Sequence, residues 1–336
     1  MSATPPIIPG STLGETKLRT FMDGRAVLAL LPTPFHHLPR FSEAVGREVW
    51  IKRDDLTGVA LGGNKIRKLE LLGAQARQAG ADTMVSVGAA QSNHARTVAA
   101  TAAMLGMTCE LVLGGPPPSE LTGNLILDDL FGAHLNFVDT TDWVTLNRAA
   151  DDLGKSVSDA GRRPFVIPVG GSVPMGALSF AAAFTELHDQ LLQAGLRTAT
   201  IVHASSSAGT QAGLEVGQRL VGASTRVVGI DVAKITGSLA DEVRRLAHET
   251  AGLLDLDLDF EPIVLDAYLG DGYGIPSESA DLATRLLART EGIIVDPVYS
   301  AKALDAVCRE TFDGPVVFWH TGGVPALFAE GVPFVK

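Results

Sequence analysis

The chain repeats one structural unit, in which a short β-branched run leads through a loop of small residues into an alanine-rich helical pattern. TMVSVGAAQSNHARTVAATAAMLGM is one such unit, and CELVLGG supplies the strand that follows it. The alternation continues in RPFVIPVGGS, TATIVHASSSAGTQAGLEVGQRL, RVVGIDV and GPVVFWHTGGVPALF. Strands this apolar, alternating with helices, are typical of parallel sheets that helices cover on both faces. The sequence therefore predicts an α/β fold.

Length and charge limit the organisation and the partners. A chain of 336 residues exceeds a typical single domain, so we expect two lobes. A net charge of −11 disfavours nucleic acid or an anionic membrane as the main partner. No uninterrupted apolar run reaches the roughly 18 residues that span a bilayer, and we recognise no signal peptide. Cys109 and Cys308 form neither a metal-type cluster nor a disulfide framework, so we expect a cytoplasmic protein without a metal.

The segment LGGNKIRKLE places a glycine-rich loop directly before a predicted helix. On a helical wheel of about 100° per residue with Lys65 at zero, Leu69 lies at about 40° and Leu72 at about −20°, whereas Arg67 points almost opposite to Lys65. Lys65 thus faces the apolar side, in the first turn, where burial and the helix dipole lower the pKa of an amine. Such an amine can form a Schiff base. A lysine whose stem packs on leucines while its ammonium reaches solvent has the same spacing.

The loop ASSSAGTQAGL lies between a predicted strand and a helix that starts near Thr210. Consecutive backbone N–H groups before a helix N-terminus form an anion site that suits a phosphate group. Ser205, Ser206, Ser207 and Thr210 can add hydroxyl donors. The alternative is a tight turn with a serine cap.

A second strand-to-helix loop, GAAQSNHAR, carries four consecutive polar side chains, Gln91, Ser92, Asn93 and His94. Ligands of α/β folds gather at the carboxyl ends of the strands, so these side chains can hold a carboxylate or a ring hydroxyl. Ser92 or Asn93 can instead be the helix N-cap.

The C-terminal segments DPVYSAK and HTGG add Tyr299 and His320. A phenol beside a loop can stack on a flat ring, although a core tyrosine and a strand-end histidine are the ordinary alternatives. The chain contains neither a G-x-S-x-G elbow nor a G-x-x-x-x-G-K-[ST] loop, so hydrolase triads and ATP chemistry lack support.

Nine motifs occur in the order found in the D-cysteine desulfhydrase and 1-aminocyclopropane-1-carboxylate deaminase family, which this chain resembles from about Leu31 to Phe328. They are IKRDDLTG, LGGNKIRKLE, GAAQSNHAR, GNLILDDLFGA, VIPVGGS, SSSAGTQAGL, GDGYGIP, EGIIVDPVYSAK and VVFWHTGG. That family belongs to the tryptophan-synthase-β-like, fold type II enzymes that use pyridoxal 5'-phosphate.

The resemblance implies a two-lobed α/β fold, in which each lobe is a mostly parallel twisted sheet covered by helices. A large cofactor-binding domain would comprise residues 1–55 and 166–336, and residues 1–30 would be a variable N-terminal extension. A small domain would comprise residues 56–165. The cofactor would lie in the cleft between them, and the enzyme would be a homodimer.

The resemblance also implies roles in cofactor binding. Lys65 would hold pyridoxal phosphate covalently, and Asn93 would hydrogen-bond the ring hydroxyl. Tyr299 would stack on the ring, while Ser300 and Thr321 would approach the ring nitrogen. The phosphate cradle would comprise Ser206, Ser207, Ala208, Gly209 and Thr210.

The remaining roles concern a small amino acid substrate. Gln91 and Ser92 match the loop that receives the substrate carboxylate, and Asn93 and His94 complete that substrate-binding loop. The catalytic side chains would be Lys65, Ser92, Tyr273 and Tyr299, with the freed Lys65 amine removing the α-proton.

Ser300 bears on the reaction. In the cyclopropane deaminases the residue after the stacking tyrosine is a glutamate, which keeps the ring nitrogen protonated. A serine hydroxyl favours an unprotonated nitrogen and a weaker electron sink, adequate when a good β-leaving group departs. The resemblance therefore implies α,β-elimination on a three-carbon amino acid, with D-cysteine giving pyruvate, sulfide and ammonia.

Other substrates stay open. SAGTQAGL with DPVYSAK also resembles L-cysteate sulfo-lyases, which release sulfite, and the cyclopropane amino acid is a third substrate. A noncatalytic cofactor-binding or nucleotide-binding protein is the alternative of another class. Ser206 and Ala208 replace family glycines, so we expect the cradle's backbone to differ slightly. Ser179 and Phe180 also depart from the family pattern, close to the expected pocket.

Overall fold

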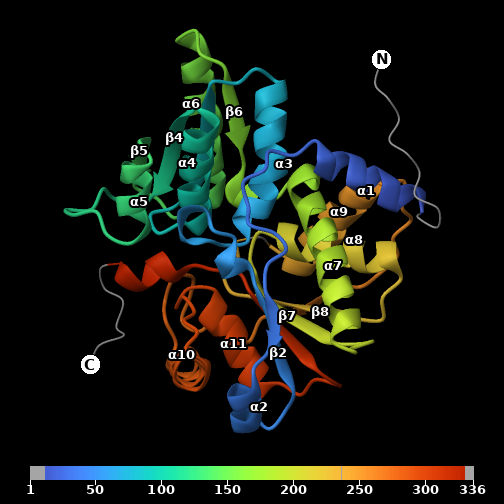
Figure 1. Ribbon diagram of the computed structural model, residues 1–336. Helices are drawn as coiled ribbons and strands as arrows, with labels where there is room; N and C mark the ends of the chain where they lie inside the picture. The colour runs from blue at the N-terminus through green and yellow to red at the C-terminus, as the bar shows by residue number, and fades with distance from the viewer. Residues whose placement is uncertain (1–11, 236, 330–336) are drawn as a thin grey trace.

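The computed structural model describes residues 12–235 and 237–329, so the first eleven residues of the expected N-terminal extension lie outside the described part. Two separate sheets, each flanked by helices, organise the described chain (Figure 1). None of the helices in these ranges is long and apolar enough to cross a membrane. The α/β fold with mostly parallel sheets is as the sequence predicts.

The larger sheet has six strands in the order β1-β2-β10-β7-β8-β9. Only the pairing of β1 with β2 is antiparallel, and the other neighbours are parallel. The strands are β1 (Phe35–His37), β2 (Val49–Arg53), β7 (Thr200–Ser205), β8 (Arg226–Asp231), β9 (Ile263–Leu265) and β10 (Val316–His320). Both ends of the chain thus contribute to one sheet.

The smaller sheet has four strands, all parallel, in the order β5-β4-β3-β6. The strands are β3 (Thr83–Ala89), β4 (Thr108–Gly114), β5 (Ala133–Val138) and β6 (Pro164–Ile167). Strand β6 runs past residue 165, where the expected small domain ends. The exact boundaries of the two domains stay a prediction.

Helices cover both sheets and connect their parallel strands (Figure 1). They are α1 (Leu13–Asp23), α2 (Pro39–Val45), α3 (Lys65–Gln78), α4 (Asn93–Leu105), α5 (Asn124–Leu130), α6 (Trp143–Asp159), α7 (Pro174–Gln193), α8 (Gly209–Val221), α9 (Leu239–Gly252), α10 (Glu278–Glu291) and α11 (Ser300–Arg309). Short 3₁₀ turns are η1 (Asp54–Leu56), η2 (Val59–Leu61), η3 (Val169–Gly171) and η4 (Val324–Phe328).

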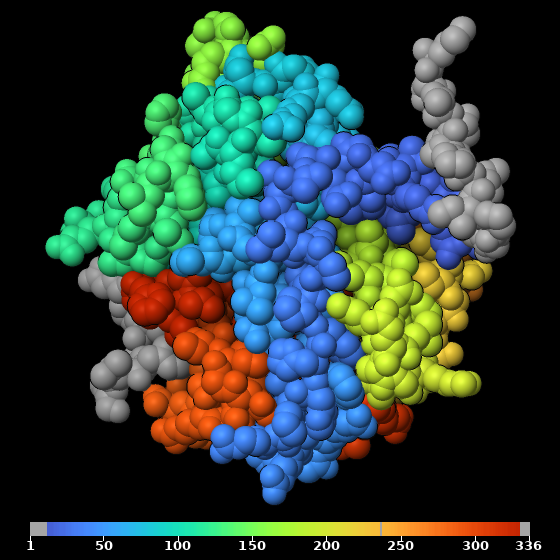
Figure 2. All heavy atoms as spheres, in the orientation of Figure 1, coloured from blue at the N-terminus to red at the C-terminus, as the bar shows by residue number. Residues whose placement is uncertain are grey.

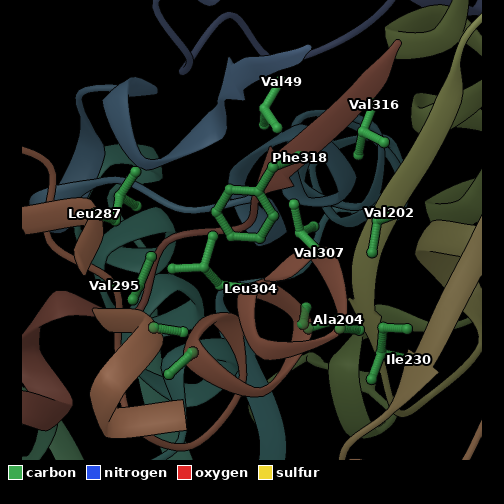
Figure 3. Packing of buried hydrophobic residues seen from close by; sticks show 14 of the residues in the cluster. Val49, Val202, Ala204, Ile230, Leu287, Val295, Leu304, Val307, Val316 and Phe318 are labelled. Carbon is green, nitrogen blue, oxygen red and sulfur yellow. The ribbon is translucent and has the colours of Figure 1, made fainter. Parts of the chain in front are cut away.

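The first four residues of strand β10 are apolar, and their packing explains why. Phe318 packs against Leu304 and Val307 of α11 on one face of the larger sheet (Figure 3). The neighbouring Trp319 points to the opposite face and packs against Phe180 of α7. Because side chains alternate along a strand, a strand covered by helices on both faces needs apolar residues at every position.

Helix α1 lies within the expected N-terminal extension. Its start is a capping box, in which the Thr12 hydroxyl accepts from the Glu15 N–H at 3.2 Å and the Glu15 carboxylate accepts from the Thr12 N–H at 2.6 Å. This reciprocal pair satisfies two backbone donors that a helix start leaves without partners. Leu18 is buried in the cluster that joins α7, α8 and α9. This helix was not predicted from the sequence.

Helix α3 begins at Lys65, as predicted, but its surroundings differ from the expected amphipathic helix. Residues 66–74 are all buried, because α7 and α4 both pack against the helix. The expectation that Arg67 points away from the core is wrong. Its side chain is 3% exposed and forms ion pairs with Asp54 and Glu186. A single-helix wheel assumes one buried face, and this helix has more than one.

Candidate active site

A cavity lies beside the loops that follow β3, β7 and β10, at the carboxyl ends of strands from both sheets. The start of α3, the glycine turn η3 and Trp143, the first residue of α6, also line it. The lining residues are Asn64, Lys65, Ser92, Asn93, His94, Trp143, Val169, Gly170, Ala204, Ser205, Ser206, Ser207, Ala208, Thr210, Ile235, Tyr273, Tyr299, Thr321 and Gly322. The folded chain thus joins loops that lie far apart in sequence.

Lys65 opens α3 and extends its amine into this cavity. The Nζ atom donates to the Asn64 Oδ1 atom at 3.2 Å, and the Asn64 Nδ2 atom donates to the Thr210 hydroxyl at 3.0 Å. Burial lowers the pKa of Lys65 to about 8, although the nearby Asp296 carboxylate partly opposes that shift. Near neutral pH a larger fraction of this amine is therefore uncharged than for an ordinary lysine, which suits a nucleophile that forms an imine.

The loop after β7 forms a concave surface at the start of α8. Ala208 adopts a positive φ of 65°, a conformation that costs a residue with a Cβ atom about 1 to 2 kcal/mol. Ala208 thus adopts a backbone conformation that glycine takes without strain, and the expected difference between this path and that of the family stays a prediction. No side chain caps the start of α8. The Gly209 N–H donates to the Ser207 carbonyl at 2.8 Å, and the remaining N–H groups of this first turn can meet an anion.

Lys68 is a second buried lysine, which was not predicted from the sequence. Its Nζ atom donates to the Gly170 carbonyl at 2.9 Å and to the Ser172 hydroxyl at 3.2 Å. That hydroxyl donates in turn to the Ser207 hydroxyl, at 2.8 Å. Burial and the nearby positive charge of Lys65 hold the pKa of Lys68 well below its usual range. On the helical wheel used for Lys65, Lys68 lies at about −60°, beside Leu72, and this angle could have predicted its burial.

A phosphate group fits this arrangement. Within the described ranges Lys68 has a carbonyl and a hydroxyl as partners and no carboxylate, so its buried ammonium lacks a counter-ion. A Cβ atom added to Gly209 would lie 2.6 Å from the Lys68 Nζ atom, which shows how closely the ammonium approaches the start of α8. A phosphate carries about −1.5 to −2 charges at neutral pH and would supply the missing charge.

Lys68→Met should weaken cofactor binding by about 10-fold to 100-fold, because a hydrogen bond to a charged group contributes about 1.5–3 kcal/mol. The same change should leave the cofactor-free protein as stable or more stable, since it removes an unpaired buried charge. Titration of pyridoxal phosphate by absorbance and thermal unfolding of both forms measure these effects. The exposed Lys155 supplies the control, Lys155→Met. Equal cofactor affinity in Lys68→Met and the control would contradict the assignment.

The loop after β3 contributes Ser92, Asn93 and His94 to the cavity. Ser92 is also the N-cap of α4, since its hydroxyl oxygen accepts from the Ala95 N–H at 3.1 Å, which leaves its own hydrogen free to donate. The Gln91 amide instead bonds to the 122–124 turn, and Gln91 does not line the cavity. Sequence position alone did not separate these two orientations.

His94 faces the cavity as a neutral imidazole. The Ser86 hydroxyl donates to the Ile167 carbonyl at 2.8 Å, so it accepts from the His94 Nε2 atom at 3.0 Å. Burial, with the charges of Lys65 and Lys68, holds the pKa of His94 well below its usual range. His94 therefore offers polarity to a ligand without adding positive charge.

Two tyrosines, Tyr273 and Tyr299, also line the cavity. The Tyr273 and Tyr299 hydroxyls are hydrogen-bonded to each other, and their rings meet edge to face at 5.9 Å. Burial raises the pKa of both phenols, so each remains protonated. Trp143 of the smaller sheet's α6 packs edge-on against Tyr273 at 6.3 Å and was not predicted.

Asp296 accepts the Tyr299 and Ser300 N–H groups at 2.8 Å and so holds the start of α11 in place.

Ser300 and Thr321 differ in access to the cavity. Thr321 lines the cavity, whereas Ser300 does not. The Ser300 hydroxyl donates to the Gly322 carbonyl at 2.7 Å and lies 3.5 Å from the Thr321 hydroxyl. Gly209, like Ser300, is part of an adjoining helix start without lining the cavity. The other residues predicted for the cradle and the ring line the cavity.

Two further expectations concern the surroundings. Ser179 and Phe180, expected close to the pocket, do not line it: the Ser179 hydroxyl donates to the Gly176 carbonyl at 2.7 Å, and Phe180 packs in the core. Helix α7 turns both away from the cavity. In the described part of the chain no group of three or more His, Cys, Asp or Glu side chains could hold a metal ion.

Two mostly parallel sheets meet at a cavity that holds an amine of lowered pKa beside an uncapped helix start, and this arrangement suits an enzyme that binds a phosphorylated aldehyde. The chain belongs to the pyridoxal-phosphate dependent enzyme family, whose sequence profile matches residues 27–322. The solved structure of an ACC deaminase homologue is 36% identical and covers 93% of this chain and 96% of that chain, with a TM-score of 0.86. These findings confirm the fold type II resemblance and pyridoxal 5'-phosphate as the cofactor.

More distant structures share the fold. A threonine deaminase from T.th. is 21% identical, with a TM-score of 0.67, and covers 91% of this chain and 97% of that chain. A fungal L-serine ammonia-lyase from Rhizomucor miehei is 18% identical, with a TM-score of 0.64, and covers 88% of this chain and 94% of that chain. At these identities the likeness concerns the fold alone.

Proposed function

We propose that this protein is a lyase that catalyses α,β-elimination on D-cysteine and produces pyruvate, sulfide and ammonia. The C–H bond at the α-carbon and the C–S bond break, and water converts the released 2-aminoacrylate to pyruvate and ammonia. Bound pyridoxal phosphate supplies the electron sink that stabilises negative charge at the α-carbon. The protein's own residues bind and orient the substrate and move its protons.

The observation that carries the proposal is that no acidic side chain among the described residues lines the cavity where the ring nitrogen is expected; the nearby Asp296 carboxylate instead accepts the Tyr299 and Ser300 N–H groups and does not line the cavity. Ser300 follows Tyr299, and its hydroxyl donates to the Gly322 carbonyl. Thr321 offers a hydroxyl at the cavity surface, whereas Ser300 does not line the cavity. Among the described residues that line the cavity, none is acidic. Without a carboxylate to hold a proton on the ring nitrogen, the sink is weaker and suits a substrate with a good leaving group.

The charge of the cavity favours cysteine over cysteate. Lys65 is the only lysine or arginine among the described lining residues, and Lys68 faces the cradle. A sulfonate brings a second permanent negative charge, which a site of this polarity would leave without a cation. A cysteine thiol needs no such partner.

The residues around the cavity would divide the proton transfers and the binding contacts among them. The Lys65 Nζ atom, whose pKa is lowered to about 8, would accept the α-proton of the substrate when the lysine amine is free. Ser92 and Asn93 donate to the substrate carboxylate and the cofactor ring oxygen, and Gln91 supports that loop. Tyr299 packs on the cofactor ring, and the protonated Tyr273 and Tyr299 pair can donate a proton to the departing sulfur.

Two sibling reactions are the alternatives. L-cysteate would release sulfite, and 1-aminocyclopropane-1-carboxylate would give 2-oxobutyrate. The 36% identity to an ACC deaminase homologue favours the second of these, and Ser300 argues against it. A noncatalytic cofactor-binding protein is the weakest alternative, since the chain belongs to a family of enzymes.

A substrate panel tests the proposal. Both enantiomers of cysteine and of cysteate, and the cyclopropane amino acid, are each incubated with the cofactor-loaded protein, and sulfide, sulfite and 2-oxo acids are measured. We expect kcat/KM for D-cysteine to exceed every other value by at least roughly tenfold. Release of 2-oxobutyrate as the fastest reaction would contradict the proposal, as would a preference for either cysteate.

We also propose a cytoplasmic homodimer. Both cysteines are free, which is typical of a reducing compartment. Large apolar side chains are exposed at Val27 (76%), Leu130 (71%) and Phe328 (74%). The N-terminal segment in blue, the green region that contains α5 and the red C-terminal η4 share the face drawn in Figure 2. A second copy packed on this face would remove that surface from water, and sedimentation equilibrium measures the resulting mass.

A further inference from the structure

The motif GNLILDDL has no role in the proposed reaction, yet its first two residues contact the loop that faces the cavity. Gly123 has a φ of 56°, and a Cβ atom there would lie 2.5 Å from the Gln91 Oε1 atom, so glycine is required. Asn124, the first residue of α5, is fully buried. The Asn124 Nδ2 atom finds acceptors within the protein, whereas its Oδ1 atom has no hydrogen-bond partner among the described residues.

Backbone groups determine how the Gln91 amide is turned. The Asn124 N–H donates to the Gln91 Oε1 atom at 2.8 Å, and the Gln91 Nε2 atom donates to the Thr122 carbonyl at 2.9 Å. A backbone N–H only donates and a carbonyl only accepts, so no other orientation of this amide makes both bonds. The 122–124 turn is thereby tied to the loop after β3.

The same logic orients Asn124 and then Asn93. The Asn124 Nδ2 atom donates to the Gln91 carbonyl at 3.0 Å, and since that carbonyl only accepts, the nitrogen must face it. The same nitrogen lies 3.1 Å from the Asn93 Oδ1 atom. Asn93 therefore uses its oxygen toward Asn124. Its Nδ2 group, with two N–H bonds, is left for the cavity that Asn93 lines.

We propose that Asn124 is a positioning residue that fixes the Asn93 amide with its N–H bonds toward the ring oxygen of the cofactor. The inference rests on the role proposed for Asn93. An N–H donor stabilises the ionised ring oxygen, whereas a flipped amide would present a carbonyl oxygen and oppose that ionisation. Asn124 thus sets which end of the Asn93 amide the cofactor meets, without touching the cofactor.

Asn124→Leu tests the inference, because leucine has a similar size and donates no hydrogen bond. The Asn93 amide then loses its preferred orientation, and the ring oxygen holds its proton more tightly. The visible absorbance of the bound cofactor, titrated with pH in the absence of substrate, should change at a midpoint about one pH unit higher than in the wild type. The affinity of cofactor-free protein for pyridoxal phosphate should fall by about tenfold.

Two comparisons separate positioning from packing. Leu125→Ala changes the neighbouring residue of α5, which is 2% exposed, and should lower thermal stability without moving the midpoint. Asn93→Ala should raise the midpoint, and adding Asn124→Leu to it should raise the midpoint no further, because Asn124 acts through Asn93. Asn124→Ser retains one hydrogen-bond donor and should give an intermediate midpoint. This variant keeps the inference testable if Asn124→Leu binds no cofactor.

An unchanged midpoint in Asn124→Leu or Asn124→Ser, with stability lowered as in Leu125→Ala, would overturn the inference. So would additive shifts in the double variant. These titrations contain no substrate, so they are independent of the substrate panel. A failure of the elimination reaction and a failure of this positioning role are therefore distinguishable.

Discussion

Lys65→Ala is expected to abolish covalent attachment of pyridoxal phosphate and to lower turnover by at least about 10³-fold, while the fold stays intact. The Lys65 amine lines the cavity and can reach a bound aldehyde. Lys68 cannot replace it, because its ammonium is held by the Gly170 carbonyl and the Ser172 hydroxyl. Borohydride reduction followed by mass spectrometry of the peptides measures attachment, and circular dichroism verifies the fold.

The exposed Lys155 again supplies a matched control, since Lys155→Ala removes an amine without touching the cavity. A reduced cofactor adduct on any lysine of Lys65→Ala would refute the assignment. Attachment should also depend on pH in the wild type. With its pKa lowered to about 8, about one tenth of the Lys65 amine is neutral at pH 7, so the rate of attachment to cofactor-free protein should rise up to about pH 8 and then level off.

Arg67→Met is expected to lower the free energy of unfolding by about 3–5 kcal/mol, the typical cost of removing one partner from a buried ion pair. The Arg67 guanidinium donates to Asp54 at 2.9 Å and to Glu186 at 2.9 Å, and Asp54 is fully buried. Methionine would leave both carboxylates without their main cation, although Lys52 still contacts Glu186. Urea denaturation of the cofactor-loaded protein measures the change.

The effect of Arg67→Met should depend on pH in a defined direction. Burial alone would raise the pKa of Glu186, but attraction to Arg67 and hydrogen bonds from Arg67 and Lys52 outweigh it and lower the pKa to about 2. A carboxyl group whose pKa is lowered on folding stabilises the protein above its ordinary pKa of about 4.5, and this contribution is lost as the pH falls toward 2. The destabilisation by Arg67→Met should therefore shrink as the pH falls below about 4.5.

Arg77 on the same helix provides the control. It is exposed near the C-terminal end of α3, so Arg77→Met should change the free energy of unfolding by no more than about 0.5 kcal/mol. Equal effects of the two substitutions would show that the Arg67 ion pairs do not stabilise the fold. A destabilisation that grows as the solution is acidified would contradict the assignment to Glu186.

Much of the fold could be predicted from local sequence. The β-branched runs at β3, β7 and β10 and the alanine-rich helices after them follow from intrinsic preferences and burial on both faces. The start of α3 at Lys65 and the start of α8 near Thr210 follow from the glycine and small-residue loops before them. Helix α1 was missed because the Pro/Thr/Gly-rich residues before it hid the capping box at Thr12.

The site was predicted in part, and the missed features all depend on contacts between segments that lie far apart in the sequence. Lys68 was missed although the wheel places it beside Leu72 on the apolar side, because its partners Gly170 and Ser172 lie about a hundred residues away in the sequence. Gln91 and Asn93 lie two residues apart in one polar loop, but only Asn93 lines the cavity. Trp143 reaches Tyr273 across the cleft, and no local pattern links two residues so distant in sequence.

The amino-acid order was enough to predict the α/β class, the family and the cofactor, because strand and helix preferences and sequence motifs can be recognised in the chain without its fold. The role of Lys65 toward that cofactor stays a prediction. Folding then selected which polar groups of those motifs face the ligand. That selection depends on hydrogen bonds and charges between segments that meet only in the folded protein, such as Asn124 with Asn93 and Lys68 with Gly170. Buried polar groups require partners, and the folded chain determines which partners are within reach.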